Sequence, residues 1–523
     1  MLSSYGVSSS RSSASPDLRS EALNIETGAY SYALFPRTTW TSGFNPGQCR
    51  SSDTLGLAQA FSSPPPPATV PKPKVHASRT PPPEELISYF IKHPTKPEAF
   101  GELGRRVQVL QSWIQTIDTP INTDKSPTLP ADLEAFSSAL FPYLREGKTS
   151  NGTTIPPLSA LFGRHKPGSK GIVIPVGISS FRFATHLIGS IRNVLRSELP
   201  IEITYAGDAD LPAEYRHFLT STFTGVETVD IIPFFNDKEL KLAGAGWAIK
   251  PFSLLASRFE KAILLDADSV LLQPPERIFT HHTSFLENGA LLFHDRLLFK
   301  NAFVERQNWW RSQLAYTTPS TTWLTTPANV DQYSENGESG LVAVDMGRLP
   351  VFLGLLHIGW QNSKEARERV TYIMGHGDKE SWWLGFELCG VPYSFGDQYG
   401  AVLGEKKVDE EKEKDKDGKE TGGVKSVTRV CSFTIAHTDD KKKLLWLNGS
   451  LLKNKMGSST EFWVPGHWMR DGVWEKGARK EDWSCMRDGV AEAVDRATME
   501  AWSGSVEEAK RLDALVRPIV GEL

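Results

Sequence analysis

The alternation of short apolar runs with amphipathic stretches between residues 171 and 265 constrains the fold more than any other feature. Runs with strand character lie at 171–176, 201–206, 226–234 and 261–265, and helical stripes lie between them at 182–195 and 252–259. Strand–helix–strand repetition at this spacing predicts right-handed crossovers and a mostly parallel sheet. The sequence therefore predicts an α/β domain with ligands bound beyond the carboxyl ends of its strands.

Two later segments extend this pattern and one interrupts it. Further strands are predicted at 289–294 and 340–345, and apolar strand-like content resumes at 430–437. Between them, residues 404–425 mix both signs of charge densely, with Val408 as the apolar residue within 404–423. This insert is predicted to be a solvated surface loop.

The N-terminal part has a different composition. Residues 1–82 are rich in Ser, Pro and Gly, and we expect them to be disordered or stem-like because they cannot bury enough apolar area to offset their ordering entropy. Apolar residues at three- and four-residue spacing predict a helical N-terminal region at 83–165. The α/β domain is then expected to span 166–523.

Charge and cysteine content exclude some classes and leave others open. A net charge of −4 gives no general attraction to nucleic acid. The four cysteines fit no zinc motif, and they leave both one or two disulfides and four reduced thiols possible. We find no apolar window of about 18 residues that predicts a transmembrane helix, and no apolar core of a signal peptide at the start.

Asp266 and Asp268 follow directly on the buried apolar run 261–265. Side chains two residues apart on an extended segment point the same way, so both carboxylates can converge on one ion. Hard divalent cations favour carboxylate oxygens together with substrate phosphates. The pair therefore predicts a metal site that neutralises the charge of a diphosphate leaving group.

Three other interpretations compete with this one. The pair can be a turn or capping pair without metal, and a second Asp-x-Asp at Asp208 and Asp210 is interpreted as a loop without a site. LLDADSV also resembles the first motif of haloacid-dehalogenase-type phosphatases. Those enzymes place the motif on the first strand and need a later Gly-Asp-x-x-x-Asp, whereas here at least three strands precede it and Trp382 stands where the second Asp belongs.

Several segments in order resemble the fungal α-1,3-mannosyltransferases, a Golgi family that elongates mannan. The matching stretches are GIVIPVG, LPIEITYAGDADLP, GWAIKPFSLLASRFEKAILLDADSVLLQPPERIF, GALLFHDR, ESGLVAVDM, GDKESWWLGFELCGVPYSF and AHTDDKKKLLWLNGSLLKNK, over roughly residues 170–456. The resemblance implies a GT-A fold, Mn²⁺, GDP-mannose as donor, retention of anomeric configuration and an oligosaccharide or glycoprotein acceptor. It also implies a membrane-anchored enzyme facing the Golgi lumen, although the sequence has no visible anchor.

Lys250 and the segment around Asp378 are further candidates. Lys250 can meet donor phosphate as a point charge, or be a surface lysine at a helix start. Asp378 and Glu380 flank a lysine and precede aromatics that can stack on sugars, so both are predicted to be catalytic. The alternative is an Asp-initiated helix whose aromatics are core residues, and the two interpretations are compatible.

The remaining candidates lie near predicted strand ends. His437 is predicted to be a third metal ligand, with Asp439 and Asp440 as alternatives. The resemblance suggests that Asn448 lies in a site-forming loop, yet Asn448 also begins a glycosylation sequon that a closed site would not tolerate. Asp345 is predicted to face the transferred sugar, and Glu338 is considered for the same role.

These observations lead to a metal-dependent glycosyltransferase as the predicted function. The donor could also be UDP-glucose, UDP-galactose or UDP-N-acetylglucosamine, because no motif reads the base or the sugar. A phosphatase and a non-catalytic sugar-binding protein are the more distant alternatives.

Overall fold

The computed structural model describes residues 83–115, 129–414, 419–455, 460–479 and 482–521. The prediction for residues 1–82 lies outside this part of the chain. The main helices are α2 (Pro83–Lys92), α3 (Phe100–Gln115), α4 (Ala131–Leu140), α5 (Pro157–Phe162), α6 (Phe181–Gly189), α7 (Ala213–Thr222), α9 (Ile249–Ala256), α10 (Glu276–His281), α11 (Thr283–Asn288), α12 (Val304–Leu314), α13 (Thr321–Leu324), α14 (Pro327–Val330), α15 (Leu349–Gln361), α18 (Lys379–Leu388) and α19 (Arg496–Val520).

The central sheet of the described residues has seven strands in the spatial order β10-β8-β9-β6-β3-β4-β5. They are β3 (Lys166–Pro175), β4 (Ile201–Tyr205), β5 (Val226–Asp230), β6 (Phe259–Leu265), β8 (Ala290–His294), β9 (Gly337–Asp345) and β10 (Ser394–Phe395). Every neighbouring pair is parallel except the two pairs made by β9. This confirms the predicted α/β class with a mostly parallel sheet.

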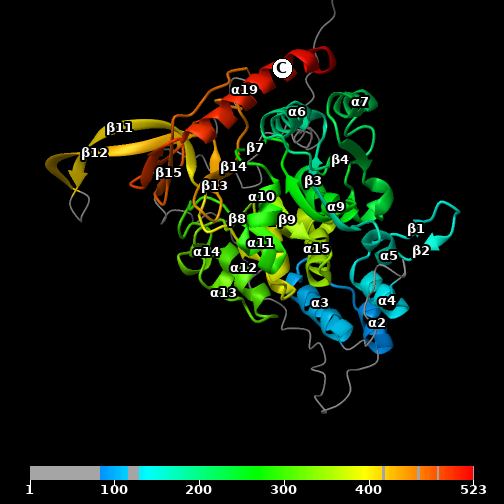
Figure 1. Cartoon of the computed structure of the whole chain (residues 1–523). Helices are drawn as coiled ribbons and strands as arrows, with labels where there is room; N and C mark the ends of the chain where they lie inside the picture. Colours follow the sequence, from blue (N-terminus) through cyan, green and yellow to red (C-terminus); the bar gives the residue numbers. More distant parts are fainter. Residues whose placement is uncertain (1–82, 116–128, 415–418, 456–459, 480–481, 522–523) are drawn as a thin grey trace, which may run out of the picture.

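Alternation of side chains along the strands divides the core into two layers. Ile172 and Ile263 point to the face covered by α6, α7, α10 and α11, whereas Val173 and Leu264 point to the face covered by α9, α15 and α18. Buried residues of α3 and α4, including Leu103 and Phe136, belong to this second layer. The helices of the N-terminal region therefore share a core with the sheet (Figure 1).

The reversed strand β9 positions polar residues at the carboxyl edge of the sheet. Because β9 runs against β6 and β8, its first residues lie where those strands end. The backbone N–H of Asp266 donates to the carbonyl of Gly340 (2.9 Å), and that of Asp295 donates to Asn336 (3.1 Å). Residues that open β9 therefore face the residues that follow β6 and β8.

Two smaller sheets follow the main one. The first has the order β13-β14-β7 and the second the order β16-β17-β12-β11-β15-β18. Their strands are β7 (Ser269–Leu271), β11 (Val402–Lys414), β12 (Glu420–Ser432), β13 (Ile435–Thr438), β14 (Leu444–Asn448), β15 (His467–Arg470), β16 (Val473–Glu475), β17 (Ser484–Arg487) and β18 (Val490–Ala493). A disulfide joins Cys431 to Cys485 across β12 and β17, and Cys389 is a buried free thiol.

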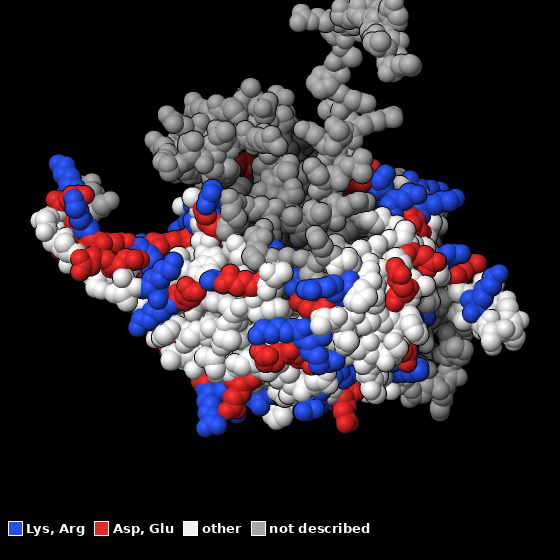
Figure 2. All heavy atoms as spheres, turned by 90° about the horizontal axis from the view of Figure 1, so that it is seen from above, with Lys and Arg blue, Asp and Glu red and all other residues white. Residues whose placement is uncertain are grey.

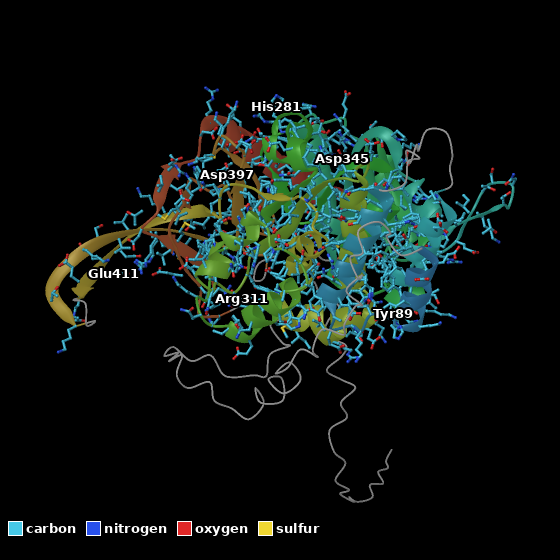
Figure 3. All side chains as sticks on the ribbon, turned by 90° about the horizontal axis from the view of Figure 1, so that it is seen from below. Tyr89, His281, Arg311, Asp345, Asp397 and Glu411 are labelled. Carbon is cyan, nitrogen blue, oxygen red and sulfur yellow. A yellow bond between two sulfur atoms is a disulfide. The ribbon has the colours of Figure 1, made fainter. Side chains whose placement is uncertain are left out.

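The prediction of a surface loop at 404–425 is wrong. Most of this insert forms the antiparallel hairpin β11–β12, which projects from the body as a charged arm (Figures 1 and 2; Glu411 is labelled in Figure 3). Opposite charges meet across it: Glu411 is paired in register with Lys425, and Arg429 forms ion pairs with Asp409 and Glu411. Cross-strand ion pairs thus replace the apolar alternation by which strands are usually recognised.

The long helix α19 lies along α6 (Figure 1). Asp513 on α19 accepts from Nε (2.8 Å) and Nη2 (2.6 Å) of Arg182 on α6. In the described residues no helix combines the length and apolar character that a bilayer span needs.

Candidate active site

The aspartate pair lies in the turn that joins β6 to β7. The Ser269 N–H donates to the carbonyl of Asp266 (3.0 Å), and the Ser450 N–H donates to that of Asp268 (2.9 Å). The two side chains are 18% and 21% exposed, so both carboxylates are partly accessible. The turn therefore presents Asp266 and Asp268 at the carboxyl edge of the sheet.

Lys250 is buried beside the first aspartate rather than on the surface. Its Nζ lies 2.8 Å from Oδ1 of Asp266 and 3.3 Å from Oδ1 of Asp378, and it donates to Oγ of Ser339 (3.0 Å). The start of α9 carries this lysine, and the start of α18 brings Asp378. Lys250 thus gathers residues from three separate segments into one charged centre.

Lys455 is the matching cation for the second aspartate. Its Nζ forms an ion pair with Asp268. Sequence reasoning did not assign it, although the segment LLKNK holds two lysines two residues apart. Lys453 turns outward to Glu461 (3.0 Å). When all three are ionised, the carboxylates of Asp266, Asp268 and Asp378 face two lysines, which leaves a surplus of one negative charge.

The surplus fits a divalent cation. Burial raises the pKa of Asp266 to about 7; Lys250 opposes this shift, whereas Asp268 and Asp378 add to it. Carboxylates crowded in this way gain from a cation with positions left for phosphate oxygens. The donor set at Asp266 and Asp268 is therefore chemically suited to Mn²⁺ or Mg²⁺.

A second charged centre lies beside the first. Nζ of Lys379 is 2.6 Å from Asp295 and 2.9 Å from Glu338, whose side chains are both fully buried. Burial raises the pKa of Asp295, but Lys379 and Arg296 outweigh it and hold that pKa below its usual value. Asp295, which follows β8, was missed from the sequence because a lone acidic residue after a strand carries no pattern.

Glu338 connects this centre to the loop after β14. Its Oε1 accepts from the N–H of Gly340 (2.9 Å) and from Nδ2 of Asn448 (3.0 Å). Asn448 is 4% exposed, so its sequon is not accessible in the folded protein. Both Glu338 and Asn448 therefore belong to the cluster. The sequence offers Glu338 as an alternative to Asp345.

Asp378 and Glu380 have different environments. Oδ1 of Asp378 accepts from Ser339 (3.2 Å) and Oδ2 accepts from Nε1 of Trp382 (2.8 Å), so Asp378 is fixed within the Lys250 centre. Glu380 instead accepts from the N–H of Asn336 (3.0 Å) and from Nε1 of Trp383. These bonds indicate that Glu380 positions the start of β9, and the aromatics around it are core residues.

Asp345 does not join the cluster, whereas His437 lies next to the Lys379 centre. Asp345 pairs in register with Lys261 at the far end of β6 and bonds Lys261 (3.4 Å) and Arg348 (3.3 Å), so its predicted catalytic role is wrong. The prediction fails because β9 runs antiparallel to β6, which places Asp345 at the opposite edge of the sheet. His437 stacks on Trp446 (4.3 Å between centroids). Both of its ring nitrogens are buried without a hydrogen-bond partner among the described residues. Burial lowers the pKa of His437 to about 4, and the neighbouring Glu338 and Asp295 oppose this shift. The described residues contain no group of three His, Cys, Asp or Glu side chains that could hold a metal, so His437 as a third ligand stays a prediction.

Glu380 should give the protein a measurable pH dependence of stability. Burial raises its pKa to about 7, compared with 4.5 in the unfolded chain. The native state therefore keeps a proton that the unfolded state loses, and stability falls as pH rises from 4.5 to 7. We expect Glu380→Gln to gain roughly 3 kcal/mol relative to wild type over this window.

Urea unfolding from pH 4.5 to 8 measures this difference. Glu365→Gln, which changes an exposed glutamate, is the control and should follow the wild-type profile. Parallel profiles for Glu380→Gln and wild type would show that Glu380 ionises in the native protein as it does when unfolded.

The sheet order, the reversed strand and the aspartate pair at the carboxyl edge together define a GT-A-type nucleotide-sugar-binding domain. Residues 169–439, just over half of the chain, match the family profile described as "Mannosyltransferase putative". The chain belongs to this mannosyltransferase family.

Individual relatives agree with this assignment. Alpha-1,3-mannosyltransferase MNT3 of Saccharomyces cerevisiae is 28% identical over 51% of this chain and 44% of its own length. Alpha-1,3-mannosyltransferase MNT2 of the same organism is 26% identical over 54% of this chain and 52% of its own length. The chain thus spans about half the length of the curated relatives it matches.

Solved structures resemble the chain more distantly. The galactosyltransferase LgtC in complex with donor and acceptor sugar analogs has a TM-score of 0.28 and 15% identity, covering 43% of this chain and 73% of its own. Glucosyl-3-phosphoglycerate synthase from Mycobacterium tuberculosis has a TM-score of 0.24 and 16% identity, covering 50% and 88%. These likenesses are too distant to place any site residue.

Proposed function

We propose that this chain is a retaining α-1,3-mannosyltransferase that moves mannose from GDP-mannose to the oligosaccharides of glycoproteins. The observation that carries this proposal is the cluster at the carboxyl edge, where Asp266, Asp268 and Asp378 face Lys250 and Lys455. Family membership supports mannose as the transferred sugar.

Asp266 and Asp268 would hold the divalent cation. When bound, the cation supplies charge neutralisation to the departing diphosphate. Lys455, paired with Asp268, is placed to exchange that contact for a phosphate oxygen, since a flexible ammonium binds phosphate as a point charge. Lys250 keeps Asp266 and Asp378 in place and offsets their charge before the cation arrives.

The remaining carboxylates are suited to orient the sugar and to stabilise positive charge. Asp378 is held rigidly by Trp382 and Ser339, so its position does not change with side-chain rotation. Fixed negative groups of this kind stabilise an oxocarbenium-like centre without reorganisation. Glu338, whose charge is offset by its ion pair with Lys379, lies next to Asp378 in this cluster.

A donor panel tests the proposal. Release of free nucleotide is measured for GDP-mannose, UDP-glucose, UDP-galactose and UDP-N-acetylglucosamine, with an α-mannoside acceptor, in Mn²⁺ or in EDTA. We expect turnover of GDP-mannose in Mn²⁺ alone, and a loss of at least about 100-fold for Asp268→Ala.

Asp208→Ala is the matched control because it alters the other Asp-x-Asp, whose first side chain is 85% exposed. It should retain wild-type activity. Turnover of a UDP-sugar instead would overturn the assigned donor, and an Asp268→Ala enzyme as active as wild type would overturn the assigned site.

We further propose that the protein works on the lumenal side of the Golgi membrane. The Cys431–Cys485 disulfide supports an oxidising compartment, because such bonds rarely persist in the cytosol. The partners would be the nucleotide-sugar donor and a glycoprotein acceptor.

A further inference from the structure

A small hollow lies next to Asp268, between α6 and the loop after β14. Its walls include Phe183, His186 and Leu187 on one side and Asp268, Ser269 and Ser450 on the other. The free space within it is about 10 Å³, which is the space of a single water-sized group. The hollow thus admits one hydroxyl group, but not a whole sugar ring.

His186 is held by a carboxylate of α19. Its Nε2 lies 2.7 Å from Oδ1 of Asp513, and Asp513 in turn accepts two bonds from Arg182. A carboxylate accepts only, so Nε2 carries the hydrogen and Nδ1 is left as an acceptor. Burial lowers the pKa of His186, and Arg182 lowers it further, so the ring is neutral near pH 7 although Asp513 opposes both effects.

Several buried histidine nitrogens have no partner among the described residues, and Nδ1 of His186 is the one that belongs to a side chain lining the hollow. His186 is 3% exposed, and Nδ1 has no hydrogen-bond partner among the residues that the structure describes. A buried acceptor without a partner is costly, so a water or a group of a bound molecule that donates to this atom would remove the cost. Its side chain lines the hollow.

We propose that this hollow is a subsite for one hydroxyl group of a bound substrate, which donates its hydrogen to Nδ1 of His186. This inference rests on the proposed sugar-transfer function. The neighbouring Asp268 disfavours an anion, and Nδ1 of a neutral imidazole requires a donor. Phe183 and Leu187 supply an apolar wall suited to the C–H groups beside a sugar hydroxyl.

The hydroxyl group belongs either to the nucleotide sugar or to the acceptor. Two variants of His186 distinguish the role of its Nδ1 acceptor from the role of its bond to Asp513. In His186→Gln the amide reaches the position of Nε2, which keeps the bond to Asp513 and removes the acceptor from the hollow. In His186→Asn the amide oxygen takes the position of Nδ1, which keeps the acceptor and removes the bond to Asp513.

Calorimetric Kd values are measured for GDP-mannose and for methyl α-mannoside, together with KM for each substrate and the Tm of each variant. We expect His186→Gln to weaken binding of one of the two ligands roughly 3- to 10-fold with little change in Tm. We expect His186→Asn to bind that ligand nearly as wild type does while losing Tm. The ligand whose binding is weakened is the one that supplies the hydroxyl group.

Wild-type affinity for both ligands in His186→Gln would overturn the subsite and leave only a water-filled hollow. A larger binding loss in His186→Asn than in His186→Gln would show that His186 acts through Asp513 alone. If the Gln variant does not fold, the Asn variant must still bind as wild type does, or the subsite is rejected. Transfer by the wild-type protein tests the function separately, and the variant comparison is repeated with whichever nucleotide sugar it uses.

Discussion

Replacing Lys379 with Met is expected to destabilise the protein by about 3–5 kcal/mol. The substitution preserves much of the side-chain volume, but it leaves Glu338 buried without its cation and Asp295 with Arg296 alone. Removing one partner from a buried ion pair is costly because the remaining charge is neither solvated nor neutralised. Guanidinium unfolding followed by tryptophan fluorescence measures the change, since several tryptophans, including Trp382 and Trp383, are buried nearby.

Lys300→Met is the matched control. Lys300 also pairs with an aspartate, Asp331 (2.8 Å), but its side chain is 49% exposed, so its loss should change stability far less than the loss of Lys379. Adding Glu338→Gln to Lys379→Met should recover part of the loss, because one uncompensated charge disappears. Equal effects of Lys379→Met and Lys300→Met would contradict the account of a buried charge centre.

Removing the disulfide should have the second large effect. The bond between Cys431 and Cys485 closes a segment of 54 residues, and constraint of the unfolded chain by a loop of that length corresponds to about 4 kcal/mol. We expect the double variant Cys431→Ala, Cys485→Ala to lose stability of this order in denaturant unfolding.

Wild-type protein treated with a reductant should unfold at the same denaturant concentration as the double variant, and the reductant should leave the double variant unchanged. The transition measured by a probe near β12 and β17 should move most. If the oxidised wild type and the double variant unfold at the same denaturant concentration, the bond contributes nothing to the free energy of unfolding.

The succession of strands and helices along the chain was predictable because apolar runs and helical stripes alternate with little ambiguity. Small shifts arose where local backbone chemistry ended an element: the strand predicted at 226–234 ends at Asp230, where Pro233 supports a 3-10 turn, and the helix predicted at 252–259 ends at Ala256. The β11–β12 hairpin was missed because charge pairing across the strands leaves no apolar period to detect.

The site was predictable only where residues are close in sequence. Asp266 and Asp268 stand out because they follow a buried run, and Asp378 because of its neighbours. Asp295 and Lys455 come from distant segments, and only the folded chain brings them to this edge. The prediction for Asp345 is wrong because the direction of β9 decides which end of the strand faces the site. The apolar pattern of a strand does not show whether it runs parallel or antiparallel to its neighbours.

The spacing of the lysines along the chain has a consequence for folding during synthesis. Lys250 precedes Asp266 by 16 residues, so the first carboxylate emerges from the ribosome after its counter-ion. Asp295 and Glu338 precede Lys379 by 84 and 41 residues. Asp295 has Arg296 beside it, but Glu338 cannot be buried cheaply until α18 has been made. The edge formed by β8 and β9 must therefore close late, and until then the nascent chain exposes two apolar strands that quality-control chaperones can bind.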